Sequence, residues 1–199
     1  MLLLFVACGE KKVHKQIEHH LEEAFHAEEE FIEYQEQLLQ LEQRDLQLYD
    51  EIVQLNDAGT NELQRLIGEA LQVTEQRGAY LEAERKAMNQ SKEQFVNLQS
   101  LIEQITAEEV HELLTKLYDT MDERYGVYEE VYETYMASLQ LTEILYEYLE
   151  KNQSPDLFST TLNDINENYE QLFQKNDQFN RLTKEYNRLK KEYYELVWE

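Results

Sequence analysis

The chain has 199 residues, a formal net charge of -24, and only five Gly and one Pro. Average usage would supply about twenty-four Gly and Pro residues in a chain of this length, so turn-rich all-β and α/β folds are excluded. A surface this acidic repels phosphate backbones and anionic lipid headgroups, which disfavours nucleic acid and peripheral electrostatic binding to membranes. With 42% hydrophobic residues, the chain should nevertheless fold, mostly as helix.

Residues 1–9 form an apolar run that ends in Cys8 and Gly9, and Cys8 is the only cysteine of the chain. A short apolar segment, a small residue and then Cys resembles the lipobox of bacterial lipoproteins, in which the signal peptide is cleaved before a Cys that carries a diacylglycerol. We therefore expect lipidation at Cys8. Phe5 stands where the pattern prefers Leu, Val or Ile, and no Lys or Arg precedes the run; a start codon upstream of Met1 would supply basic residues. The alternative is an ordinary apolar N-terminus with a buried thiol.

Turn chemistry divides residues 10–199 into four segments of nearly equal length. Residues 56–60 form a loop by composition, Thr106 with Glu109 predicts a capping box, and residues 152–155 supply a stop, an N-cap serine and a first-turn proline. The predicted helices are about 10–55, 60–105, 107–151 and 155–198. They predict a single all-α domain, an elongated antiparallel up-and-down four-helix bundle.

Each segment carries an apolar column with a seven-residue period, which predicts left-handed, coiled-coil-like packing. The predicted core column of the first segment is Phe25, Ile32, Leu39, Leu46 and Val53. The other three columns run from Ile67 to Ile102, from Leu114 to Leu149 and from Phe158 to Tyr193. Helix packing within one chain and between chains uses the same pattern, so the oligomeric state stays open.

Charge is segregated along the chain. Eight glutamates and no Lys or Arg lie between Glu18 and Glu36, whereas Lys184, Arg188, Lys190 and Lys191 cluster near the end of the sequence. In an up-and-down bundle the fourth helix lies beside the first, so we expect ion pairs between the two stretches. Exposed pairs of this kind contribute only about 0 to 1 kcal/mol.

Two Glu-x-x-His sequences, Glu23 to His26 and Glu108 to His111, have the ligand spacing of ferritin-like di-metal bundles. Such matches arise by chance in a Glu-rich chain, and these two would lie about 15 to 20 Å apart along parallel helices. A possible surface cation group at helical spacing consists of His14, Glu18, Glu23 and His26. A solvated polar face is the alternative. Because no phosphate-binding loop, nucleophile elbow or Ser-His-Asp pattern can be found in the sequence, we expect no cofactor and no enzymatic activity.

Tyrosine is abundant, with 14 copies and a dense series in the third segment. Tyr125, Tyr132 and Tyr146 share one heptad column and are the candidate ligand contacts, since exposed aromatic rings stack on sugars or on partner side chains. The alternative is that they lie at the core boundary, with the ring buried and the hydroxyl wet.

Several stretches together resemble the YkyA-like family of cell-wall-binding lipoproteins of Gram-positive bacteria such as bacilli and staphylococci. They are Val6-Ala7-Cys8-Gly9, residues 82–95, residues 117–125 and residues 184–193. The resemblance implies an all-helical up-and-down bundle, a lipid anchor outside the cytoplasm and a role at the envelope. It supplies no catalytic residues.

The sequence thus predicts a non-enzymatic, lipid-anchored extracytoplasmic lipoprotein that binds or organises components of the cell envelope, peptidoglycan among them. Teichoic acids are polyanions, which this surface should bind only through bridging divalent cations, so the expected ligand is wall glycan, a peptide stem or another envelope protein. A cytosolic coiled-coil scaffold is the first alternative, and acylation of Cys8 would separate the two. A di-metal carboxylate enzyme is the second, and it would contain bound iron or manganese.

Overall fold

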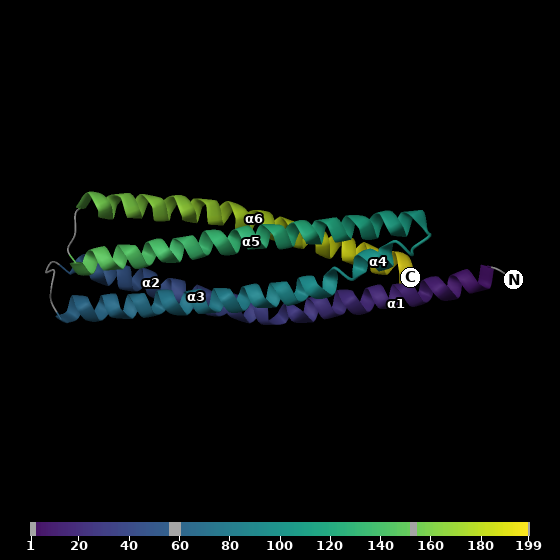
Figure 1. The fold of residues 1–199 in the computed structure, drawn as a ribbon, viewed down its shortest axis with the longest axis horizontal. Coiled ribbons are helices and arrows are strands. Elements are labelled where there is room, and N and C mark those ends of the chain that lie inside the picture. Colours follow the sequence, from purple (N-terminus) through teal and green to yellow (C-terminus); the bar gives the residue numbers. More distant parts are fainter. Residues whose placement is uncertain (1–2, 56–60, 152–154, 199) are drawn as a thin grey trace. The chain divides into compact units, whose positions relative to one another are not determined.

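The computed structural model describes residues 3–55, 61–151 and 155–198, and the described residues form six α-helices (Figure 1). In chain order these are α1 (Leu3–Ala27), α2 (Glu29–Gln54), α3 (Asn61–Phe95), α4 (Leu98–Ile102), α5 (Glu108–Lys151) and α6 (Pro155–Trp198). α1 with α2 and α3 with α4 correspond to the first two predicted segments, and α5 and α6 to the other two. The predicted all-helical, antiparallel fold is confirmed. None of the described helices is long and apolar enough to cross a membrane.

Thr106 lies just before α5, as the sequence predicts, but its hydrogen-bond partner is Glu10 rather than the predicted Glu109. The backbone N–H of Thr106 donates a hydrogen bond to Glu10 Oε1 of α1 at 3.0 Å, and the Thr106 hydroxyl donates to the same oxygen. A carboxylate from another helix therefore lies at the N-terminus of α5, where the helix dipole favours negative charge. The hydrogen bonds from Thr106 lower the pKa of Glu10 below its ordinary value.

The first predicted segment is interrupted at Glu28, between α1 and α2. The Glu28 N–H donates to the carbonyl of Phe25 at 3.0 Å, which is a turn with a three-residue step rather than a continued α-helix. No Gly or Pro marks the place. The break accompanies the inward position of the Glu28 carboxylate, which binds Arg124 of α5.

The chain consists of two compact units, and α2, α3, α5 and α6 each contribute to both. Unit 1 contains residues 1–30, 86–129 and 176–199. Unit 2 contains residues 31–85 and 130–175.

Aromatic rings form part of the core of unit 1. Phe95 of α3 is 1% exposed, and its ring centroid lies 5.4 Å from that of Tyr118, 5.9 Å from Tyr125 and 6.1 Å from Tyr186. Edge and offset contacts between such rings add about 0.5 to 1.5 kcal/mol per pair beyond the burial of area.

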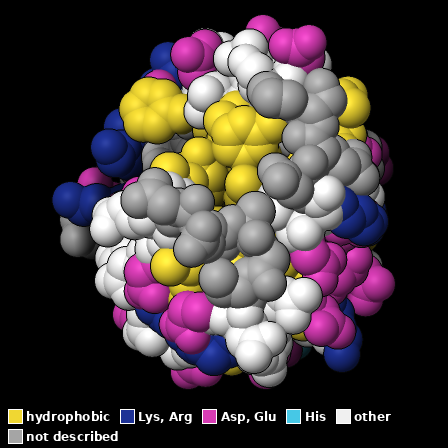
Figure 2. Space-filling view, turned by 90° about the vertical axis from the view of Figure 1, so that its left-hand side faces the viewer, with side chains coloured by type: hydrophobic (Ala, Val, Ile, Leu, Met, Phe, Trp, Pro, Cys, Tyr) yellow, Lys and Arg dark blue, Asp and Glu magenta, His cyan; other side chains and the backbone are white. Residues whose placement is uncertain are grey.

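The core of unit 2 contains a mainly aliphatic cluster contributed by α2, α3 and α5. Its buried members are Leu48, Ile52, Leu63, Leu66, Ile67, Ala70, Val73 and Tyr146. Figure 2 shows hydrophobic side chains near the middle of one face of the molecule, with both acidic and basic side chains around the margin.

The column that the sequence predicted as the core of the first segment is wrong. Its members, Phe25, Ile32, Leu39, Leu46 and Val53, are 54 to 64% exposed. The buried column lies one residue earlier and consists of Ile17, Ala24, Phe31, Leu38 and Ile52, with Asp45, whose side chain is 14% exposed, at the remaining heptad position. The columns of the other segments are correctly predicted, since Ile67, Leu114 and Ile165 and their heptad neighbours are mostly buried.

Candidate functional site

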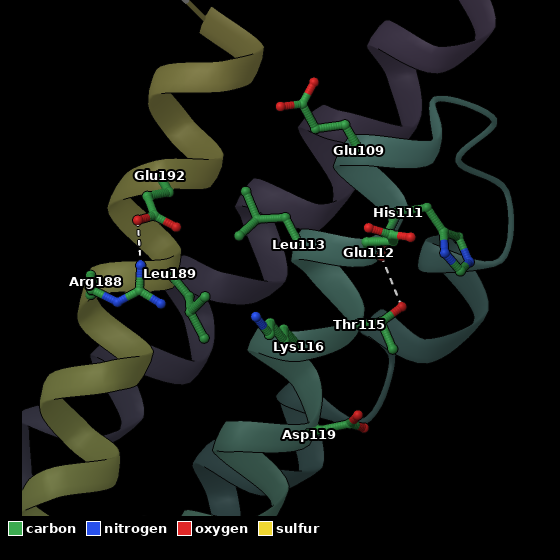
Figure 3. Close-up of a pocket in the computed structure, with 10 residues that line it drawn as sticks. All are labelled: Glu109, His111, Glu112, Leu113, Thr115, Lys116, Asp119, Arg188, Leu189 and Glu192. Carbon is green, nitrogen blue, oxygen red and sulfur yellow. Dashed lines mark hydrogen bonds and ion pairs between the residues drawn. The ribbon is translucent and has the colours of Figure 1, made fainter.

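A groove lies between the start of α5 and the end of α6 in unit 1, with a volume of about 630 Å³ (Figure 3). Leu113 of α5 and Leu189 of α6 face each other across it, and Lys116 points into it. The groove is open to solvent, and Leu189 is 1% exposed. Its apolar floor and charged rim can accept a small ligand that has both apolar and charged groups.

Charges of both signs line this groove. Its acids are Glu109, Glu112, Asp119 and Glu192, and its bases are Lys116 and Arg188. Arg188 donates to Glu185 at 2.7 and 2.9 Å and also to Glu192, so this guanidinium is held by its own helix. The hydrogen bond from Arg188 lowers the pKa of Glu185, and Lys116 adds to that effect. Lys116 differs from Arg188 in that Figure 3 draws it pointing into the groove with no dashed line to another residue.

A buried arginine holds the helices of unit 1 together. Arg124 of α5 is 4% exposed and donates to both carboxylate oxygens of Glu28, at 2.9 and 2.8 Å. It also donates to the hydroxyl of Thr183 in α6 at 2.7 Å. Ser91 of α3 donates to Glu28 at 2.8 Å and shares a hydrogen bond with the Tyr125 hydroxyl. Such bidentate, charge-assisted contacts fix helix register.

A second buried arginine does the same in unit 2. Arg77 of α3 is 1% exposed and donates to Asp45 Oδ2 of α2 at 2.7 Å. It also donates to the hydroxyls of Tyr135 and Tyr169 at 3.1 and 2.9 Å, so the guanidinium joins all four helices of this unit. Asp45 accepts a further hydrogen bond from the Tyr146 hydroxyl at 2.7 Å. Both arginine clusters are buried and connect protein groups to one another, so they are structural rather than ligand-binding.

The structure places the three candidate tyrosines inside the bundle. Tyr125, Tyr132 and Tyr146 are 3%, 8% and 1% exposed. Their hydroxyls bond to Ser91, Glu82 and Asp45, and burial raises the pKa of each phenol. Their rings are therefore not offered to a ligand in solvent, and they match the core-boundary alternative instead.

The candidate metal ligands do not gather. Among the described residues, no group of three or more His, Cys, Asp or Glu is arranged to hold a metal ion. His14 bonds to the hydroxyl of Tyr193 at 3.0 Å, and His26 lies 3.4 Å from Glu29 on its own helix. Glu18 and Glu23, the other two candidate ligands, likewise belong to no group of that kind among the described residues. Figure 3 shows His111 on the side of α5 away from α6.

The end of α6 lies beside the acidic stretch of α1, as predicted, but the expected ion pairs between the two stretches are not found among the described residues. Lys190 Nζ is 5.3 Å from the centroid of Phe25, and Glu22 and Glu28 are near enough to act on its charge. Burial lowers the pKa of Lys190 and these two carboxylates oppose the shift. Two other basic residues pair along α6 itself, Arg188 with Glu185 and Glu192, and Lys191 with Glu195.

The backbone of Cys8, the predicted lipidation site, is part of α1. Its side chain is outside the part of the chain that the structure describes.

The fold and these sites define an all-helical, antiparallel bundle in which the described residues form a buried arginine cluster in each unit and a charged groove in unit 1. Residues 12–196 match the YkyA family, whose description is "Putative cell-wall binding lipoprotein". Because the match extends over nearly the whole chain, the chain belongs to this family, and the resemblance found in the sequence is confirmed.

Among solved structures, the chain is similar to a 1.6 Å crystal structure of a conserved protein of unknown function from Staphylococcus aureus. The TM-score is 0.82 at 16% sequence identity, and the alignment covers 94% of this chain and 95% of that one. At this identity the likeness shows the fold alone. The comparison with curated proteins found no match.

Proposed function

We propose that this protein is a non-enzymatic, lipid-anchored extracytoplasmic protein that binds or organises components of a Gram-positive cell envelope. The observation that carries the proposal is the match of residues 12–196 to a family of cell-wall binding lipoproteins. The apolar run before Cys8 supports it, because it resembles the signal segment that precedes the lipidated Cys of a bacterial lipoprotein. The anchor is a diacylglycerol on Cys8.

The groove of unit 1 is the proposed contact for the wall. Its apolar floor, formed by Leu113 and Leu189, and its mixture of acids and bases suit a short peptide that carries both charges. The peptide stem of peptidoglycan has this chemistry. Teichoic acid does not, because a polyanion is repelled by a chain of net charge -24 unless divalent cations bridge the two.

Acylation tests the anchor. The wild-type chain, expressed in a Gram-positive host, should sediment with membranes and carry a lipid mass on Cys8. Cys8→Ala should leave the membrane fraction and lose that mass. A wild-type chain that stays in the cytosol without lipid would contradict the proposal and favour the alternative of a cytosolic scaffold.

Binding of muropeptides, the disaccharide-peptide units of peptidoglycan, tests the groove. We expect Cys8→Ala protein to bind them in a calorimetric titration, and mass spectrometry should find the muropeptides chemically unchanged. Lys116→Glu should weaken binding, whereas Lys151→Glu, a matched charge reversal on the exposed end of α5 in unit 2, should not. Equal loss in both variants would point to net charge rather than the groove.

A further inference from the structure

Four large aliphatic side chains form an exposed line along α2, which we call the α2 stripe. It consists of Ile32, Leu39, Leu46 and Val53, which are 57%, 56%, 64% and 54% exposed. All four lie in unit 2 and on one helix. Single exposed aliphatic residues are normal on protein surfaces, but four of them at the same heptad position of one helix form a regular line that a partner helix can follow.

The spacing of the α2 stripe is that of one heptad position, which is one of the two apolar columns that form a coiled-coil seam. Its members are seven residues apart, so they stay on one side of a helix that packs along another helix at a 3.5-residue period. α2 already has a column for its own core one residue earlier, in which Phe31, Leu38 and Ile52 are 3 to 5% exposed. The helix therefore carries two apolar columns with the same period, and the core of unit 2 uses only one of them.

The charges around the α2 stripe are acidic. Glu36 and Asp50 are exposed and lie three and four residues from members of the stripe, so they flank it on the helix surface. The only basic residue of α2, Arg44, lies on another side of the helix, where it binds Glu69 of α3 and Glu51. A second copy of this stripe would bring like charges together, and an anionic lipid surface would be repelled in the same way.

We propose that the α2 stripe docks an amphipathic helix of a partner protein, one whose apolar column is flanked by Lys and Arg. The apolar column of that helix would cover the stripe, and its cations would meet Glu36 and Asp50. Because the stripe is a single column wide, the contact is weak and selective rather than obligate. This inference is independent of the wall contact proposed for the groove of unit 1.

Designed peptides test the occupant. The probes are a three-heptad helix with Leu in its apolar column and Lys beside it, the same helix with Glu in place of Lys, and a scrambled Lys peptide of equal composition. Fluorescence anisotropy with Cys8→Ala protein should show binding of the Lys helix alone. Leu39→Gln with Leu46→Gln should weaken this binding by about tenfold or more.

Two further variants separate shape from charge. Ile144→Gln with Phe173→Gln removes two exposed apolar residues of unit 2 outside the α2 stripe, which are 40% and 77% exposed, and should leave binding within about twofold of wild type. Glu36→Lys with Asp50→Lys should reverse the preference, so that the Glu helix binds and the Lys helix does not. All of the variants change exposed side chains, so far-UV circular dichroism should stay unchanged.

Three results would overturn the proposal. The Lys helix and the scrambled Lys peptide could bind equally well, which would indicate attraction to net charge only. The Leu39→Gln, Leu46→Gln variant could bind the Lys helix as wild type does. Sedimentation velocity could show a wild-type dimer that this double variant abolishes, in which case a second copy occupies the stripe. Loss of muropeptide binding would bear on the groove and would leave this inference untouched.

Discussion

Removal of the Asp45 carboxylate should destabilise the protein strongly, because it would leave the guanidinium of Arg77 without its closest counter-charge. Arg77 is 1% exposed and lies 2.7 Å from Asp45. Breaking a buried pair by removing one partner costs about 3 to 5 kcal/mol. Arg77 keeps the hydroxyls of Tyr135 and Tyr169 and a more distant Glu42 at 3.8 Å.

The expected loss for Asp45→Ala is therefore at the lower end of that range, increased by about 1 kcal/mol because the Tyr146 hydroxyl loses its acceptor. We expect the free energy of unfolding to fall by about 3 to 4 kcal/mol. Urea unfolding followed by circular dichroism at 222 nm measures this value by linear extrapolation. Asp50→Ala, the matched control on the exposed face of α2, should change stability by at most about 0.5 kcal/mol.

The double variant Arg77→Met with Asp45→Leu tests the explanation itself. It removes both charges, so it should be at least about 1 kcal/mol more stable than Asp45→Ala, although it retains fewer hydrogen bonds. The reasoning is refuted if Asp45→Ala costs no more than Asp50→Ala, or if the double variant is less stable than Asp45→Ala.

Three other changes should alter stability in predictable directions. A Cβ at Gly68 or Gly126 would meet nothing within 4 Å, so Gly→Ala at either helical position should stabilise the protein by about 1 kcal/mol, and a lower urea midpoint would contradict this. Glu28→Ala should cost about 3 kcal/mol by leaving Arg124 buried without its carboxylate, with Glu28→Gln recovering part of the loss in the same assay. The hydrogen bonds at the start of α5 lower the pKa of Glu10 in the folded state. The stability that Glu10 contributes is therefore present above its pKa in the unfolded chain and is lost as the pH falls through its pKa in the folded protein. Thermal melts from pH 6 to pH 3 should accordingly be less pH-dependent for Glu10→Gln than for the wild type.

The helices could be predicted from the sequence because the turn signals and the heptad period are local. The boundaries near residues 105, 151 and 155 agree with α4, α5 and α6 to within a few residues. The break at Glu28 could not be predicted, because no Gly or Pro marks it and the residue that Glu28 contacts, Arg124, is 96 residues away in sequence.

The choice between two adjacent apolar columns in the first segment could not be made correctly from local pattern. The buried column contains Asp45 and Ala24, so it looks less apolar than the exposed one. Asp45 is acceptable in the core only because Arg77 and Tyr146 lie opposite it, and those contacts come from other helices. A carboxylate at a core heptad position together with an arginine in another helix was the signal that could have revealed the pair.

The tyrosines illustrate the same limit at the candidate site. Their heptad spacing shows that they share a helix face, but only the positions of Ser91, Glu82 and Asp45 show that this face is buried. Of the groove residues, the sequence draws attention to Glu109, His111 and Arg188 for other reasons, and no pattern in the sequence brings them together as one site. Leu113 and Lys116 meet Leu189 only because α5 and α6 lie side by side in unit 1.

Co-sedimentation with purified sacculi tests the proposed wall contact most directly. Cys8→Ala protein is mixed with sacculi before and after removal of teichoic acid, with Ca²⁺ or with a chelator. We predict binding that survives both treatments and is weakened by Lys116→Glu, because the proposed ligand is the peptide stem of peptidoglycan. Protein that stays in the supernatant under every condition, or binds only when teichoic acid and Ca²⁺ are both present, would contradict it.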